Sequence, residues 1–202
     1  MSAVLLEWGE HFLASFLRVI LALILAAGGT IPLGLIIGYE KRLDFILSPL
    51  FYLTYPIPKI VFLPVILLWL GLGEASKIFL LTLLVSYQIL ITVRDRAKSI
   101  PQDFLYAAYS LGAAPKNIYW KVLFPYCLPA VFTAMRLALG TTIAVLFMTE
   151  SFATTKGLGY VIMDAWGRGD WDEMFLGVAG MSFLGLSLYC LLDYLERKFC
   201  PW

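Results

Sequence analysis

The chain has 202 residues, of which 61% are apolar and only 14% are charged, and its mean hydropathy is +0.84. Soluble domains carry about 45–50% apolar and about 25% charged residues, so this composition excludes a water-soluble globule. The 15 Lys and Arg residues nearly balance the 14 Asp and Glu residues, which excludes a nucleic-acid binder that works through a large positive charge. The sequence therefore predicts an integral membrane protein.

Five apolar segments are long enough, or nearly so, to cross about 30 Å of hydrocarbon, which takes about 20 helical residues. They are continuous apolar blocks rather than short strands of alternating polarity, so a transmembrane β-barrel is disfavoured. We expect one all-α domain over residues 1–202, since no linker or strong internal repeat divides the chain. The expected spans cover residues 12–38, 48–70, 75–93, 126–149 and 174–192.

The chain is poor in residues that carry chemistry. A single histidine, His11, excludes a His-rich metal centre. The three cysteines are widely spaced among apolar residues, so we expect small buried hydrophobes rather than a disulfide framework or a metal site (Cys127, Cys190 and Cys200). The cores of the expected spans contain no His, Asp or Glu, which disfavours a membrane-embedded enzyme.

The basic residues predict the orientation of the chain. Nine Lys and Arg residues lie in connections on one side of the expected spans, against three on the other side. Short loops rich in Lys and Arg stay in the cytoplasm, so we expect the N-terminus outside and the C-terminus inside. The two longer polar segments are then a cytoplasmic loop over residues 94–121 and an external loop over residues 150–173.

The cytoplasmic loop is expected to contain two short helices. Ser99, with Gln102 three residues later, is typical of a capping box, from which a helix should run to about Leu111 and stop at Gly112. Pro115 should open a second helix that leads into the fourth span. Small residues on the first helix would let another backbone come close, whether of a docking partner or of the chain's own bundle: Leu105, Ala107, Ala108 and Gly112.

A longer motif covers the same loop. Ala107-Ala108 is followed after three residues by Gly112, and after nine more by Val122-Leu123-Phe124-Pro125. This pattern resembles the signature loop of binding-protein-dependent ABC importer permeases, which reads Glu-Ala-Ala-x3-Gly-x9-Ile-x-Leu-Pro. Tyr106 stands where the family commonly has Glu, so the role of that carboxylate does not carry over. The resemblance implies a helix that docks into an ATPase subunit through Leu105, Tyr106, Ala107, Ala108, Gly112, Ala113 and Pro125.

Other segments resemble the nitrate, sulfonate and taurine branch of these permeases: Ile57-Pro58-Lys59, residues 69–77 and residues 157–162. Members of that branch generally have an additional N-terminal span, so this chain is expected to be close to the five-helix core. The resemblance implies a type I importer in the cytoplasmic (inner) membrane of a bacterium or archaeon. Two permease copies, expected as a homodimer, would form the pathway, with two ATPase subunits inside and a substrate-binding protein outside.

The sequence contains no G-x4-G-K-[ST] loop to cradle phosphates, so ATP and Mg are expected on the partner ATPase and no cofactor in this chain. The resemblance suggests a small anion as cargo, such as a sulfonate, taurine or nitrate. A vitamin precursor or another small organic solute is the alternative. A secondary transporter that needs no ATP is disfavoured, because inverted repeats are not evident.

Two cations inside expected spans, Lys59 and Arg136, are candidates to face the pathway and attract an anion. An unpaired charge at that depth costs about 3 kcal/mol, so an ion pair or a snorkelling side chain is the alternative for each. Arg18 lies nearer the outer end of its span and favours the second interpretation. Thr141 and Thr142 could line the path or bond to the preceding turn of their own helix. Glu150, at the outer end of the fourth span, could gate the path or lie at the membrane interface.

Two further segments have open interpretations. The prolines of the second span free backbone carbonyls, which either flank a cargo site or bend the helix for packing (Pro56, Pro58 and Pro64). The external loop is aromatic and acidic, which suits a docking surface for a binding protein or, alternatively, a short helix that closes the outer face. Its candidate docking residues are Tyr160, Asp164, Trp166 and Trp171.

Overall fold

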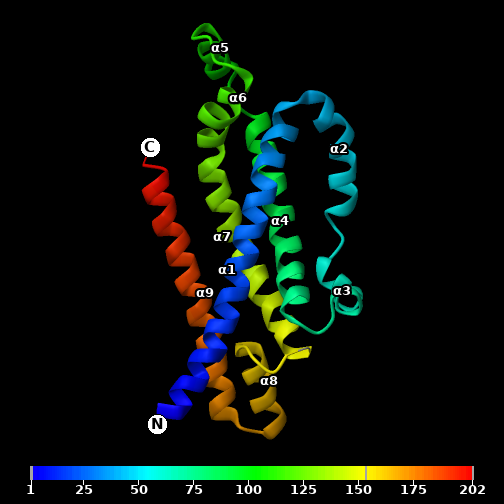
Figure 1. Ribbon diagram of the computed structural model, residues 1–202, viewed down its shortest axis with the longest axis vertical. Helices are drawn as coiled ribbons and strands as arrows, with labels where there is room; N and C mark the ends of the chain where they lie inside the picture. Colours follow the sequence, from blue (N-terminus) through cyan, green and yellow to red (C-terminus); the bar gives the residue numbers. More distant parts are fainter. Residues whose placement is uncertain (1, 153, 202) are drawn as a thin grey trace.

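The structure is a computed structural model that describes residues 2–152 and 154–201, with side chains from Glu7 onward, and it is a bundle of helices (Figure 1). The predicted all-α fold is confirmed. In chain order the elements are α1 (Ser2–Tyr39), α2 (Lys41–Thr54), η1 (Lys59–Phe62), α3 (Leu63–Leu70), α4 (Glu74–Lys98), α5 (Gln102–Ser110), α6 (Pro115–Ile118), η2 (Tyr119–Leu123), α7 (Phe124–Phe152), α8 (Leu158–Arg168) and α9 (Trp171–Phe199).

Four helical stretches are long and apolar enough to cross a membrane, and a bent pair of helices passes the same test when taken together. Up to five spans therefore agree with the expected number. Each straight helix runs beyond the apolar core that the sequence defines, because backbone hydrogen bonding continues through the polar residues that flank it. The four stretches are Glu7–Tyr39, Glu74–Lys98, Pro115–Phe152 and Trp171–Phe199.

The bent pair occupies the second expected span, which is therefore not one straight helix. α2 and the η1–α3 segment meet at 80° across a break of residues 55–58. Pro56 and Pro58 lack a backbone N–H and cannot donate helical hydrogen bonds, which explains the break, although Tyr55 itself keeps helical dihedral angles. Pro64 lies in the first turn of α3, where a proline is tolerated, and so does not interrupt the helix. Pro32 leaves α1 continuous.

The centre of the bundle is the contact between α1 and α4, which lie side by side along most of their length (Figure 1). α4 buries apolar side chains every fourth residue, which places them on one helical face: Leu81, Val85, Ile89 and Val93. Two glycines of α1 bring the backbones together, because a Cβ atom at Gly34 would lie 2.9 Å from that of Val93 and one at Gly38 would overlap the Arg94 carbonyl oxygen.

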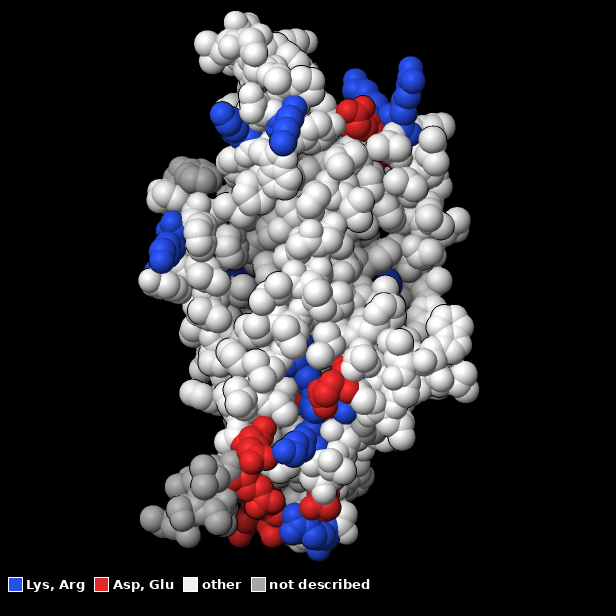
Figure 2. Space-filling model, in the orientation of Figure 1, with Lys and Arg blue, Asp and Glu red and all other residues white. Residues whose placement is uncertain are grey.

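The helices place the two predicted loops at opposite ends of the molecule. α5 forms one tip and α8 the other, and Lys and Arg side chains gather toward the α5 end, whereas acidic and basic groups mix near α8 (Figures 1 and 2). Between them α7 and α9 border an open apolar groove of about 880 Å³. Of the cysteines, Cys127 is buried as expected, but Cys190 is exposed and Cys200 half-buried, because both lie on the outer side of α9 or beyond its end.

Candidate functional site

The loop between α4 and α7 differs at its start from the prediction. α5 begins after Pro101 without a side-chain cap, and the Ser99 hydroxyl instead donates to the Arg96 carbonyl oxygen at 2.8 Å. The predicted capping box is therefore wrong, because α4 continues to Lys98 and takes Ser99 as its own terminal residue. The end of α5 agrees with the prediction, since Gly112 adopts a φ of +72°, which favours glycine.

The second short helix, α6, begins at Pro115 as predicted and continues through the π-helical turn η2 into α7. Pro125 is half-buried where η2 passes into α7, and it supplies no backbone N–H to the continuous helix at that point. The loop therefore consists of a separate short helix, α5, and a second half that is continuous with α7.

The exposed face of α5 is not the predicted stripe of small residues. Leu105 is only 6% exposed and Ala108 is half-buried, so that stripe packs on the chain itself. Ala107 and Gly112 are exposed, and Ala113 is half-buried. The helix instead presents large apolar side chains to its surroundings, which is typical of an interaction surface: Phe104, Tyr106, Tyr109 and Leu111, the last 88% exposed.

Arg136 pairs with carboxylates of a neighbouring helix. Its Nη1 atom lies 3.2 Å from Asp193 Oδ1 and 2.5 Å from Glu196 Oε2, both on α9. These two ion pairs join α7 to α9 at one end of the apolar groove. Arg136 is therefore ion-paired in this conformation, in agreement with the ion-pair alternative, and its role in a pathway stays a prediction.

Lys59 lies at the break between α2 and η1. Its Nζ atom donates to the carbonyl oxygens of Thr54 and Tyr55 at 3.1 and 3.0 Å, and it lies 4.0 Å from the centre of the Tyr87 ring. These carbonyls lie at the end of α2, where the Thr54 oxygen also accepts a turn bond from the Ile57 amide at 3.3 Å, so Lys59 caps the helix that the prolines terminate. Among the described residues no carboxylate lies within 4.0 Å of this ammonium group.

The two candidate threonines of α7 differ in their exposure. Thr142 is fully buried, and its hydroxyl donates to the carbonyl oxygen of Ala138 at 2.7 Å, so it does not line an open surface. Thr141 is exposed, and its hydroxyl accepts a 3.5 Å contact from the side-chain amide of Gln88 on α4. The Gln88 Oε1 atom is buried and has no donor among the described residues. Sequence reasoning missed Gln88, although an amide within an apolar span was a visible signal.

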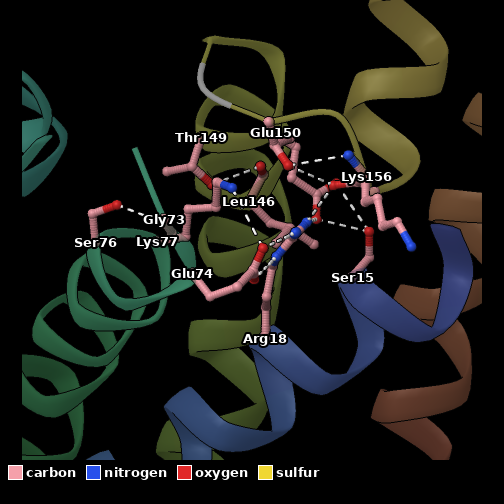
Figure 3. A network of polar contacts seen from close by, with 12 residues as sticks. Ser15, Arg18, Gly73, Glu74, Ser76, Lys77, Leu146, Thr149, Glu150 and Lys156 are labelled. Atoms are coloured by element: carbon pink, nitrogen blue, oxygen red, sulfur yellow. Dashed lines mark hydrogen bonds and ion pairs between the residues drawn. The ribbon is translucent and has the colours of Figure 1, made fainter. Parts of the chain in front are cut away.

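Glu150 is the centre of a buried polar network near the α8 end (Figure 3). It is 0% exposed and accepts hydrogen bonds from Arg18 Nη1 at 2.6 Å, Ser15 Oγ at 2.8 Å and the Gly159 amide at 2.8 Å. Arg18 also binds both carboxylate oxygens of Glu74 at 2.6 Å. The Glu150 side chain therefore points into the subunit in this conformation, and its role as a gate stays a prediction.

The glycines after α7 let the chain pass directly over this carboxylate. A Cβ atom at Gly157 would lie 2.5 Å from Glu150 Cδ, and the φ of Gly157 is +132°, which side chains rarely adopt. At Gly159 a Cβ atom would lie 2.7 Å from Glu150 Cβ. Lys77, buried on α4, adds a second cation 3.6 Å from Glu74, so the network holds two positive and two negative groups.

α8 presents part of the predicted docking surface. Trp166 and Trp171 are each more than half exposed, whereas Tyr160 is half-buried and stacks on His11 with ring centres 5.9 Å apart. The exposed Asp164 forms an ion pair with Arg168 at 2.9 Å. Arg168 also binds Glu173 at 2.6 Å, and this hydrogen bond raises the pKa of Arg168 above its ordinary value. The surface is therefore aromatic, with acidic charge that is partly neutralised.

The chain matches a family model described as "Binding-protein-dependent transport system inner membrane component" over residues 30–200. It is 33% identical over 193 residues to the taurine transport system permease protein of Escherichia coli K12, an alignment that covers 96% of this chain and 70% of that protein. It is 28% identical over 192 residues to a putative aliphatic sulfonates transport permease protein of Bacillus subtilis 168, and that alignment covers 95% of this chain and 70% of that protein.

A solved structure has the same fold. An inward-facing structure of the MetNI methionine ABC transporter contains a chain that superposes with a TM-score of 0.83 at 19% identity, and the match covers 98% of this chain and 99% of that one. At this identity the likeness concerns the arrangement of helices alone.

Proposed function

Since the chain belongs to the family of binding-protein-dependent transport system inner membrane components, the permeases of ABC importers, we propose that it carries a small oxyanion such as a sulfonate. The chain is a transport subunit rather than an enzyme, and in its relatives the ATPase is a separate subunit. The cargo class rests on the likeness to the taurine and sulfonate permeases. The family also supports a location in the cytoplasmic membrane, with an ATPase and a binding protein as partners.

We propose that the pathway runs along the face of α4 that lies between Tyr87 and Gln88. Consecutive residues on a helix point about 100° apart, so these two side chains flank one strip of the helix surface. Lys59 lies against Tyr87 on one border, and Thr141 contacts Gln88 on the other. The Lys59 ammonium group has no carboxylate partner among the described residues, and the Gln88 Oε1 atom has no donor there. Both groups are therefore suited to bind a polar solute. A second copy of the chain would supply the facing wall.

The two tips of the molecule are the proposed docking sites. The exposed Phe104, Tyr106 and Leu111 of α5 fit an apolar groove on an ATPase subunit, whereas Trp166 and Trp171 fit a binding protein on the outside. In this proposal ATP closes the ATPase pair, draws the α5 helices together and reorients the spans. The chain itself performs no covalent step.

Reconstitution tests the proposal. The permease would be purified with the ATPase subunit that accompanies it in its own membrane, placed in liposomes, and assayed for uptake of labelled taurine in the presence of binding protein. ATP-dependent uptake that stops when ATP is removed is the expected result. Uptake that needs only an ion gradient would refute the importer. ATP-dependent uptake of solutes that lack an oxyanion group, with no uptake of taurine or other sulfonates, would retain the importer and refute the cargo class.

A further inference from the structure

One helix, α1, touches both ends of the molecule. It is continuous over 38 residues, and Arg18 and Tyr39 are 21 residues apart along it, about 31 Å at 1.5 Å per residue. Arg18 lies in the buried network near α8 (Figure 3), and Tyr39 lies beside α5, where its hydroxyl contacts that of Tyr109.

At the α5 end one side-chain hydrogen bond joins α1 to α5, which also packs on α7 through Phe104, whose ring centre lies 6.3 Å from that of Tyr126. The Tyr39 and Tyr109 hydroxyl oxygens lie 2.5 Å apart, and among the described residues this is the one side-chain hydrogen bond from α5 to a spanning helix. The Tyr39 ring also packs edge-on against Tyr119, with ring centres 5.3 Å apart, and the Tyr119 hydroxyl donates to Glu40 at 2.9 Å. The end of α1 is therefore tied to both halves of the loop that contains α5.

At the opposite end α1 holds the segment 154–159, which leads into α8. Two backbone amides of that segment donate to α1 side chains: Gly157 to His11 Nδ1 at 3.1 Å, and Leu158 to Ser15 Oγ at 2.9 Å. Arg18 Nη1 donates to the Lys156 carbonyl oxygen at 2.8 Å. Three successive residues of the segment are thus bound to one face of α1.

Between these ends α1 has little freedom to bend independently of α4. The close approach at Gly34 and Gly38 interlocks the two backbones, and the Arg18–Glu74 ion pair joins the same two helices near α8. A displacement of one end of such a packed helix is shared by the other, because close-packed interiors are only slightly compressible.

We infer that α1 couples the movement of α5 to the external segment 154–159, with Tyr39 as the positioning residue at one end and Ser15 at the other. This inference rests on the proposed function, in which α5 receives the ATPase. Because coupling between two sites is reciprocal, a change at either attachment should be felt at the other end.

Hydrogen exchange of the permease–ATPase complex in nanodiscs tests the coupling. The Gly157 and Leu158 amides report the external attachment, and ATP with vanadate moves the ATPase. In the wild type we expect exchange of this peptide to change when ATP and vanadate are added. Tyr39→Phe removes only the hydroxyl and should reduce that change about 5-fold, the factor that one hydrogen bond typically supplies.

Three further variants sharpen the test. Tyr109→Phe should match Tyr39→Phe, and the double variant should be no more affected than either, since both remove the same bond. Tyr194→Phe on α9 is the matched control, because its hydroxyl is exposed, lies outside the proposed docking surfaces and has no hydrogen-bond partner among the described residues. Ser15→Ala should change the exchange of α5, which checks reciprocity. Wild-type exchange of α9 peptides in the absence of nucleotide confirms that each variant is folded.

A full response in Tyr39→Phe, or an equal loss in Tyr194→Phe, would overturn the coupling while leaving ATP-dependent uptake, and hence the proposed function, intact. A wild-type complex whose external peptide ignores ATP and vanadate would overturn it as well. Absence of ATP-dependent uptake by the wild type is a separate result, and it would reject the proposed function itself.

Discussion

Replacing Glu150 by Gln should destabilise the protein by about 2–3 kcal/mol, because it removes the negative charge from the centre of the buried network. The carboxylate accepts hydrogen bonds from Arg18, Ser15 and the Gly159 amide. A glutamine oxygen still accepts from the last two, but its NH2 group faces the Arg18 guanidinium. Arg18 keeps Glu74, which limits the loss to the lower end of the range for a broken buried pair.

Alanine at position 150 should be worse, by about 3–5 kcal/mol, since three buried donors then lose their acceptor. The matched control is Lys156→Met, which breaks an ion pair with Glu10 whose partners are both more than 60% exposed, and should change stability by less than about 1 kcal/mol.

Equilibrium unfolding in mixed micelles measures these differences, and the double variant Arg18→Met with Glu150→Gln completes the comparison. Because it removes both charges that face each other, it should be less destabilised than the sum of the single variants. A Glu150→Gln protein as stable as the wild type would refute the reasoning. So would a double variant that shows simple additivity, because the two groups would then not interact.

Three other predictions follow from the described contacts. Gly157→Ala should lower the free energy of unfolding by about 3 kcal/mol or more in the same assay, because Gly157 has a φ of +132° and an added Cβ would lie 2.5 Å from Glu150 Cδ. Gly167→Ala, where an added Cβ meets open space, should be neutral or stabilising. Leu111→Ser should reduce copurification of the ATPase at least about tenfold without lowering permease yield; unchanged copurification would contradict the docking proposal. Lys59→Met should lower anion uptake at least about tenfold, and Lys59→Arg, which keeps the charge, should restore it. Arg136→Met should instead destabilise the protein and leave anion selectivity unchanged, because Arg136 is paired with Asp193 and Glu196.

Features set by nearby residues were predictable from the sequence. The spans follow from runs of apolar residues, the end of α5 from Gly112, and the start of α6 from Pro115, because each depends on local backbone preferences. Ser99 shows the limit of such reasoning: it can serve as an N-cap or as the end of the preceding helix, and the length of α4 decided the matter.

Long-range pairing was not predictable. Arg136 finds its carboxylates 57 and 60 residues away on α9, and Glu150 finds Arg18 at a separation of 132 residues. The sequence shows that each charge needs a partner, but helix packing determines which one. The face of α5 that turns inward is set in the same way, because Leu105 and Ala108 become buried only where η2 lies beneath them.

The apolar tip of α5 bears on how the chain is produced in the cell. Three large apolar side chains of this helix are at least half exposed, and Leu111, which follows it, is 88% exposed. A permease synthesised without its ATPase would therefore present an adhesive surface at the membrane boundary, which is the kind of feature that chaperones and membrane proteases recognise in orphan subunits. We expect balanced synthesis of the two subunits to determine how much permease accumulates.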